Sequence, residues 1–213
     1  ARRRARGAGG RRIARRRCAQ PGKPRDDAAV GLCRRRTAPH GRAGKLGSVE
    51  RQSPLAALTA RARPQLREAA AQRIGLELDI GEGLDVVQLD MRKTKQIVYN
   101  LLSNAVKFSA SGGPVQLRAR RVGRDRVGVL EGKWPTHRFP QADNEYNDFV
   151  EICVSDHGIG IAQDNMGRLF QAFSQIDSSL ARKFEGTGLG LAMVKQLTEL
   201  QGGAVAVASA ERQ

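Results

Sequence analysis

Cysteine, aromatic residues and long apolar runs are all scarce in this chain of 213 residues. The three cysteines, Cys18, Cys33 and Cys153, lack paired metal-ligand spacing, so neither a zinc site nor a disulfide framework is predicted. No apolar run approaches the roughly 18–20 residues that cross a bilayer, and none follows the N-terminal arginines to form a secretory signal. We therefore expect a reduced, cytoplasmic setting and no membrane contact from this segment.

Positive charge is concentrated in the first part of the chain. The net charge is +16, and +13 of it belongs to residues 1–42, where fourteen Arg and one Lys are offset only by Asp26 and Asp27. Residues 43–213 therefore carry +3 and have the composition of an ordinary folded protein. The length is sufficient for one domain with a full core and some additional segments.

Residues 1–42 are predicted to lack regular structure, because Arg, Ala, Gly and Pro supply 31 of them and no periodicity is present. Three interpretations stay open: a solvated basic tail, an arm that binds nucleic-acid phosphates, or a GC-rich gene translated out of frame. No aromatic residue is interleaved for base stacking, so nucleic acid is not an expected partner. Sequence typical of folded protein begins near Ala43.

Helix and strand patterns alternate after residue 43. Residues 43–74 are expected to form a linker and a helix, and residues 75–213 one domain. The expected elements of that domain are a strand at 75–80, a helix at 91–108 capped by Asp90, strands at 115–120 and 149–155, helices at 166–175 and 189–201, and a strand at 204–209. Residues 123–147 form a long polar connection. A single mixed sheet with helices on one face accommodates this order.

The predicted helix 91–108 carries a polar stripe. At about 100° per residue, Asn100, Asn104 and Lys107 fall within about 60° of one another, and apolar residues cover the other faces. A solvated surface stripe is one explanation. The alternative is a ligand site, because an Asn oxygen suits Mg²⁺ that phosphates already neutralise and a Lys can meet a phosphate as a point charge.

Asp156 follows the strongest strand pattern and precedes Gly158 and Gly160. The glycines permit a tight turn with close backbone approach. A plain turn is one interpretation, and a carboxylate that accepts a hydrogen bond from the exocyclic amine of adenine is the other. We assign no proton transfer to His157, which lies in the same turn.

Gly186-Thr-Gly-Leu-Gly190 precedes the last predicted helix. Backbone N–H groups at a helix N-terminus bind phosphate, although this glycine run alone is weak evidence and matches neither a Walker loop nor a dinucleotide fingerprint. The polar stretch 175–183 could form a lid over a nucleotide, with Arg182 or Lys183 reaching the terminal phosphate. Phe170 and Phe173 serve either that lid or packing.

Together these segments resemble the ATP-binding catalytic domain of bacterial sensor histidine kinases, within the fold shared with gyrase, heat-shock chaperones and mismatch-repair ATPases. Residues 96–109 resemble the asparagine box, 156–161 and 186–191 the two glycine boxes, and 169–173 the phenylalanine box. The resemblance covers about residues 75–209. It implies an α/β two-layer sandwich with a mixed, mostly antiparallel sheet, and it implies ATP and Mg²⁺ as cofactors.

The resemblance also implies roles for individual residues. Asn104 would ligate Mg²⁺, Asn100 and Lys107 would face the phosphates, and Asp156 would bind the adenine amine. Asn100, Lys107 and Arg182 would be the catalytic residues. The nucleotide site would comprise Asn100, Asn104, Lys107, Phe108, Asp156, Gly158, Gly160, Ile161, Phe173, Gly186, Thr187, Gly188, Leu189, Gly190 and Leu191.

Position 100 separates two kinds of chemistry. The related ATPases place a Glu there to activate water, whereas this chain has Asn100. Without a carboxylate base, phosphoryl transfer to a positioned acceptor is favoured over hydrolysis. The resemblance therefore implies a protein histidine kinase in two-component signalling, with a response regulator downstream, a homodimeric intact protein and a possible membrane anchor outside this chain.

Two departures from the family pattern bear on activity. None of His40, His137 and His157 has the acceptor-histidine context, so the acceptor would be a separate dimerisation module, in cis or in trans, and the chain alone is expected not to autophosphorylate. The family also continues past Ser209 into a further strand, so an unpaired sheet edge is expected here. A non-catalytic ATP-binding or protein-interaction module is the alternative function.

Overall fold

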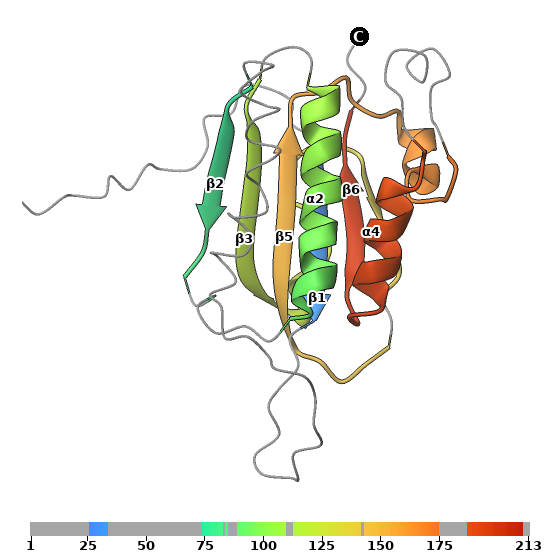
Figure 1. The fold of residues 1–213 in the computed structure, drawn as a ribbon. Coiled ribbons are helices and arrows are strands. Elements are labelled where there is room, and N and C mark those ends of the chain that lie inside the picture. The colour runs from blue at the N-terminus through green and yellow to red at the C-terminus, as the bar shows by residue number, and fades with distance from the viewer. Residues whose placement is uncertain are drawn as a thin grey trace, which may run out of the picture.

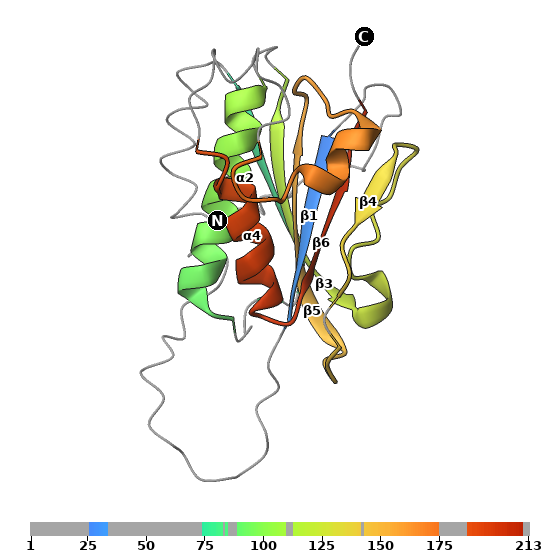
Figure 2. The same ribbon diagram turned by 90° about the vertical axis from the view of Figure 1, so that its right-hand side faces the viewer.

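The computed structural model describes residues 26–33, 74–82, 84, 89–109, 113–141, 143–174 and 187–210. These residues form one sheet with two α-helices on one of its faces (Figures 1 and 2). The elements are β1 (Asp26–Cys33), β2 (Leu76–Ile80), α2 (Met91–Phe108), β3 (Val115–Gly123), η1 (Arg124–Arg126), β4 (Thr136–Arg138), β5 (Asp148–Asp156), η2 (Gln163–Arg168), α4 (Gly190–Glu199) and β6 (Ala204–Ala208). The two-layer α/β arrangement predicted from the sequence is confirmed.

The sheet has six strands in the order β2-β3-β5-β1-β6-β4. Only β2 and β3 pair in parallel, and the other four neighbouring pairs are antiparallel. The sheet is therefore mixed and mostly antiparallel, as expected. In Figure 2 α2 and α4 lie together on one side of it.

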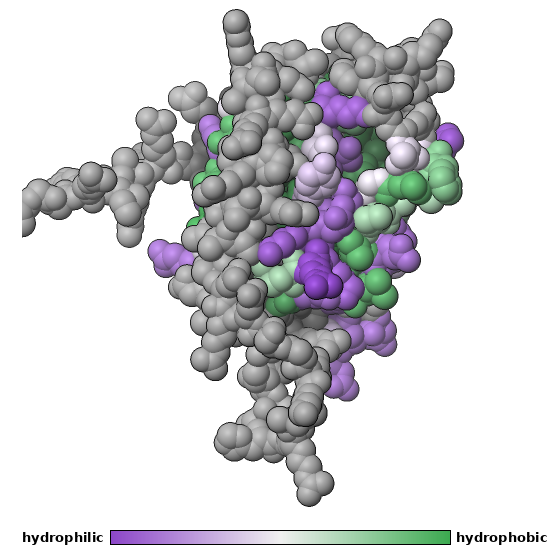
Figure 3. Space-filling view, in the orientation of Figure 1, coloured by the Kyte–Doolittle hydropathy of each residue, from purple (hydrophilic) through white to green (hydrophobic). Residues whose placement is uncertain are grey.

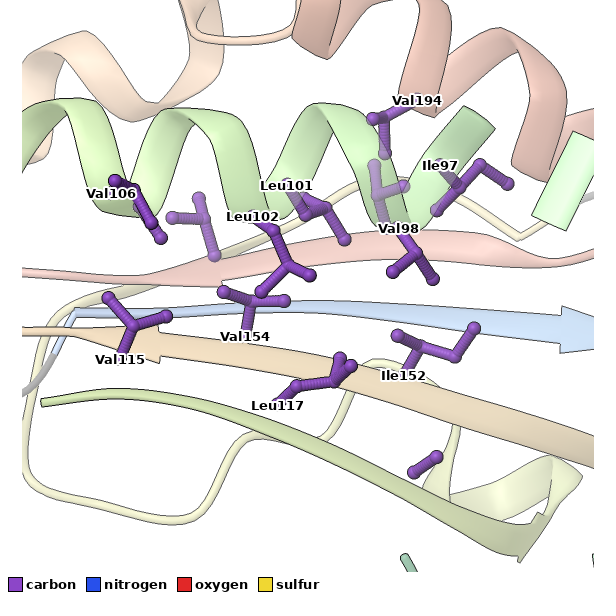
Figure 4. Packing of buried hydrophobic residues seen from close by; sticks show 14 of the residues in the cluster. Ile97, Val98, Leu101, Leu102, Val106, Val115, Leu117, Ile152, Val154 and Val194 are labelled. Atoms are coloured by element: carbon purple, nitrogen blue, oxygen red, sulfur yellow. The ribbon is translucent and has the colours of Figure 1, made fainter. Parts of the chain in front are cut away.

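The core lies between α2, α4 and the sheet. Asp90 caps α2 by accepting the backbone N–H groups of Arg92 and Lys93, both at 3.1 Å. This fixes where α2 begins, and the apolar stripe of the helix then faces the sheet (Figure 4). The fully buried side chains of this interface include Ile97, Val98, Leu102, Val106, Val115, Leu117 and Ile152. Each stabilises the fold by about 1.5–3 kcal/mol relative to an exposed position.

Strand β1 corrects the expectation for residues 1–42. Asp26–Cys33 form a strand between β5 and β6, with Asp26 opposite Asp156 and Gly31 opposite both Glu151 and Ala204. The expectation of no regular structure is therefore wrong for these eight residues. The stretch shows no period-two alternation, and its one local signal is the short apolar run at residues 28–33, which is compatible with a strand paired on both sides but is set among arginine-rich sequence. The rest of residues 1–42 lies outside the described residues, as do residues 43–73, for which a linker and a helix are expected.

Strand β6 is paired on both sides, by β1 and by β4. Among the described residues β6 is thus an inner strand, and the edge strands of the sheet are β2 and β4, while the absence of a further strand after Ser209 stays a prediction. The long polar connection supplies one of the two neighbours, because its residues Thr136–Arg138 form β4.

The helix predicted at 166–175 is also corrected. The structure has a 3₁₀-helix, η2, at Gln163–Arg168, followed by turns up to Ser174. Gly167 lies inside the predicted stretch and disfavours an α-helix, whereas a 3₁₀-helix is commonly short. Across the described residues, no helix is both long and apolar enough to cross a membrane.

Candidate nucleotide site

Asn100 joins the middle of α2 to the start of α4. Its side chain is buried, at 9% exposure. Its Nδ2 donates to the backbone carbonyl of Gly190 at 3.1 Å, and its Oδ1 accepts from Nε2 of Gln96 at 3.2 Å. Both the nitrogen and the oxygen of the amide are thus hydrogen-bonded, and Asn100 holds α2 against the start of α4.

The loop after β5 lies against the C-terminal end of α2. A Cβ atom on Gly158 would be 2.9 Å from the carbonyl oxygen of Phe108 and 2.6 Å from Oδ1 of Asp156. Only glycine fits that approach. Asp156 Oδ1 accepts the N–H of Gly158 at 2.7 Å, which orients the carboxylate at the strand end.

Two further hydrogen bonds anchor this loop. His157 is buried, and its Nδ1 lies 2.9 Å from the carbonyl oxygen of Pro114. At the other end of the loop, Ile161 N–H donates to Oγ of Ser209 at 2.9 Å. His157 therefore connects the loop to the residue that precedes β3.

The segment before α4 lies against Phe173. Gly188 has a φ of +68°, and a Cβ there would be 3.1 Å from the Cα of Phe173. The N–H of Phe173 donates to the carbonyl of Gly188 at 3.1 Å. Among the described residues, no side chain caps the N-terminus of α4 and its first turn has no acidic residue. The first N–H groups of α4 are therefore suited to an anionic ligand.

The two phenylalanines have different positions. Phe170 is 4% exposed and packs in the core, whereas Phe173 is 77% exposed and has a positive φ of 60°. Figure 3 shows apolar residues at the surface near η2, beside the hydrophilic residues of α2 and α4. Of the two alternatives given above, packing thus applies to Phe170, and Phe173 is the exposed residue beside Gly188.

The other predicted site residues occupy the same three segments. Asn104, Lys107 and Phe108 are half-buried on the last turns of α2, and Lys107 Nζ lies 5.4 Å from the centre of the Phe108 ring. Gly160 has a φ of +78°. Thr187 is exposed, and Leu189 and Leu191 are half-buried around the start of α4. Arg182, Lys183 and Gly186 lie outside the described residues.

Sequence reasoning missed two polar residues of this region. Gln96 lies one helical turn before Asn100 and orients its amide, and the four-residue spacing is the signal that could have identified it. Ser209 holds the loop from the end of β6, and no local sequence pattern indicates that contact.

The geometry brings neutral amides, a carboxylate, a lysine and helix-terminal N–H groups into one region. The contacts that join it are Asn100 with Gly190, Phe108 with Gly158, and Phe173 with Gly188. These groups can bind phosphates through the N–H groups and the lysine, and the carboxylate can accept a hydrogen bond from an amino group of a ligand.

Comparison with known proteins identifies relatives of this arrangement. Residues 89–213 match the family described as histidine kinase-, DNA gyrase B-, and HSP90-like ATPase. The chain is 37% identical over 172 residues to the circadian input-output histidine kinase CikA of Synechococcus elongatus, covering 78% of this chain and 19% of the relative. It is 35% identical over 139 residues to the alginate biosynthesis sensor protein KinB of Pseudomonas aeruginosa, covering 65% of this chain and 19% of the relative. The chain thus spans about a fifth of the length of these relatives.

Proposed function

The chain belongs to the histidine kinase-, DNA gyrase B-, and HSP90-like ATPase family, and we propose that it transfers the γ-phosphoryl group of ATP to a histidine on a separate dimerisation module. Residues 89–213 are an ATP-binding catalytic domain of the kind found in histidine kinases. In the proposed reaction the bond between the γ-phosphorus and the bridging oxygen breaks, a phosphorus–nitrogen bond forms on the histidine, and ADP leaves. A response regulator would then take the phosphoryl group, in a homodimeric intact protein.

The observation that carries this proposal is the environment of Asn100. Its amide donates to the Gly190 carbonyl and accepts from Gln96, so it is buried and engaged at both ends. A Glu or Asp at this position would direct an oxygen at the Gly190 carbonyl oxygen. Asn100 therefore holds the start of α4 and offers no carboxylate base to activate water, which favours transfer over hydrolysis.

The remaining roles follow from position. Asp156, oriented by the Gly158 N–H, would accept from the adenine amine. The N–H groups at the start of α4 would hold phosphate oxygens, and Lys107 would contribute a positive charge. Arg182, from the segment between Phe173 and Gly188, would stabilise the terminal phosphate during transfer.

Asn104 fits a role as the protein ligand of Mg²⁺. It lies one turn after Asn100 on α2 and is half-buried. A neutral oxygen is a suitable ligand for Mg²⁺ that also contacts phosphates. When bound, Mg²⁺ would partly neutralise the negative charge of the phosphates.

Nucleotide titration of three variants tests the site. We expect Asp156→Ala and Asn104→Asp to abolish ATP affinity while circular dichroism shows an intact fold. Asp125→Ala removes an exposed carboxylate on η1 and should bind like the wild type. ATP should be preferred to GTP by the wild type only. Unchanged titrations in both site variants would overturn the site assignment.

Labelled ATP tests the reaction itself. The chain alone should bind ATP without labelling itself and should hydrolyse it slowly. Addition of a histidine-bearing dimerisation hairpin from a histidine kinase should produce an acid-labile, base-stable label on the hairpin. Binding without transfer would favour the non-catalytic module, and fast hydrolysis without transfer would favour a water-activating ATPase.

A further inference from the structure

The connection between β3 and β5 is folded onto the turn before β6. Nη1 of Arg124 donates to the backbone oxygen of Asn144 at 2.7 Å, to its Oδ1 at 2.9 Å and to the backbone oxygen of Tyr146 at 3.0 Å. Asn144 Nδ2 donates in turn to the Gly202 carbonyl at 3.0 Å. These contacts fix the part of the connection that precedes β5 to the turn where β6 begins.

The same connection reaches the nucleotide loop through one serine. The N–H of Ser209 donates to the carbonyl of Pro135 at 3.2 Å, and Oγ of Ser209 accepts the N–H of Ile161 at 2.9 Å. Ser209 is fully buried, at 0% exposure. One residue thus links the two parts: the backbone of Ser209 bonds to the segment that enters β4, and its side chain bonds to the end of the loop that begins at Asp156.

Phe139, which directly follows β4, makes a second contact, with the segment that contains Phe170 and Phe173. Phe139 donates its N–H to the Val205 carbonyl at 3.0 Å, which continues the pairing of β4 with β6. Its ring packs edge-on against Phe170, with centroids 5.1 Å apart. Phe170 precedes Phe173, the residue that bonds to Gly188.

We infer that Ser209 is a positioning residue of the nucleotide site and that residues 134–139 support the two segments that flank the nucleotide. The inference rests on the proposed function, since it concerns the same site. Ser209 holds Ile161 at one end of the loop while Asp156 would contact the base at the other end. Without the hydroxyl, Ile161 N–H loses its acceptor and the loop no longer has one fixed position.

Nucleotide affinity and thermal stability of matched variants test this role. Loss of one buried hydrogen bond corresponds to about a three- to tenfold weakening of nucleotide binding, which we expect for Ser209→Ala and for Ser209→Cys, whose thiol is a poor acceptor. Ser209→Thr keeps the hydroxyl and should restore affinity. The control Thr198→Val removes an equally buried hydroxyl, which donates to the Val194 carbonyl within α4 at 2.7 Å, and should lower the melting temperature without weakening binding.

Trp134, the single tryptophan of the chain, precedes Pro135 and gives a direct optical reading. Saturating nucleotide should change its emission in the wild type and in Thr198→Val, and the change should be absent or smaller in Ser209→Ala. Wild-type affinity and an unchanged tryptophan response in Ser209→Ala and Ser209→Cys would overturn the inference alone. No nucleotide binding by the wild type would overturn the proposed function as well.

Discussion

Asn100→Asp should destabilise the fold more than the same change four residues later. The substitution replaces the Nδ2 donor with an oxygen, so the Gly190 carbonyl, 3.1 Å away, loses its partner. The side chain is only 9% exposed, so water cannot readily take the place of the donor. Removing one partner of a buried hydrogen bond costs about 1–3 kcal/mol, a large part of the total stability of a domain, which is about 5–15 kcal/mol.

The destabilisation should depend on pH. Burial beside a carbonyl oxygen raises the pKa of the new carboxyl in the folded state above about 3.9, the ordinary value for Asp. Below about pH 3.9 the carboxyl is protonated in both states and its O–H can donate to Gly190, so the deficit is small. The deficit grows as the pH rises and becomes constant above the raised pKa.

Urea unfolding at pH 4.5 and 7.5 measures both effects. Asn104→Asp is the matched control, because it makes the same chemical change on a half-buried position of the same helix, and it should shift the midpoint much less. If Asn100→Asp unfolds at the wild-type midpoint at pH 7.5, or loses no more stability than Asn104→Asp, then the Asn100–Gly190 contact does not hold α2 to α4.

Two further predictions concern the backbone of the site and the start of α2. Gly188→Ala should cost about 1–2 kcal/mol through its left-handed φ of +68° and should weaken nucleotide binding in calorimetry. Gly75→Ala, whose Cβ would meet only Pro114, at 3.8 Å, among the described residues, should have little effect on stability or binding. Equal effects of the two substitutions would refute the strain argument. Asp90→Ala should lose about 1 kcal/mol at pH 7 as a helix cap. The hydrogen bond from Lys93 holds the pKa of Asp90 below its usual value. The stabilisation by Asp90 is therefore fully present above about pH 3.9 and is lost as the pH falls through the lower pKa of the folded state. A difference in urea midpoint between Asp90→Ala and the wild type that persists in acid would contradict this prediction.

Much of the fold was predictable because each element carries its own local signal. The apolar stripe of α2 and its cap at Asp90 fixed both the type and the start of the helix. The strands at 76–80, 115–123 and 148–156 carry alternating or continuous apolar patterns. Strand β1 carries only the short apolar run at residues 28–33, set among arginines, and its place between β5 and β6 follows from pairing with distant segments.

The site was predictable to the extent that its residues are close in sequence. The glycines at 158 and 188 were identified from local motifs. Glycine is needed at 158 because the backbone of Phe108 approaches closely, and at 188 because the φ is positive. Contacts between distant segments could not be read in the same way. The bond from Ile161 to Ser209 and the packing of Phe139 on Phe170 depend on how β4 and β6 pair.

The placement of β1 has a consequence for how the chain reaches its native state. The two strands that pair with β1 lie far from it in the sequence, and the register brings Asp27 beside Ala208. Closing such long loops costs entropy before any contact compensates for it, and topologies dominated by distant pairings fold slowly. Of the described elements, β1 is synthesised first, and it can pair only after β5 and then β6 have been made. Assembly of the centre of the sheet can therefore finish only after nearly the whole described chain has been synthesised.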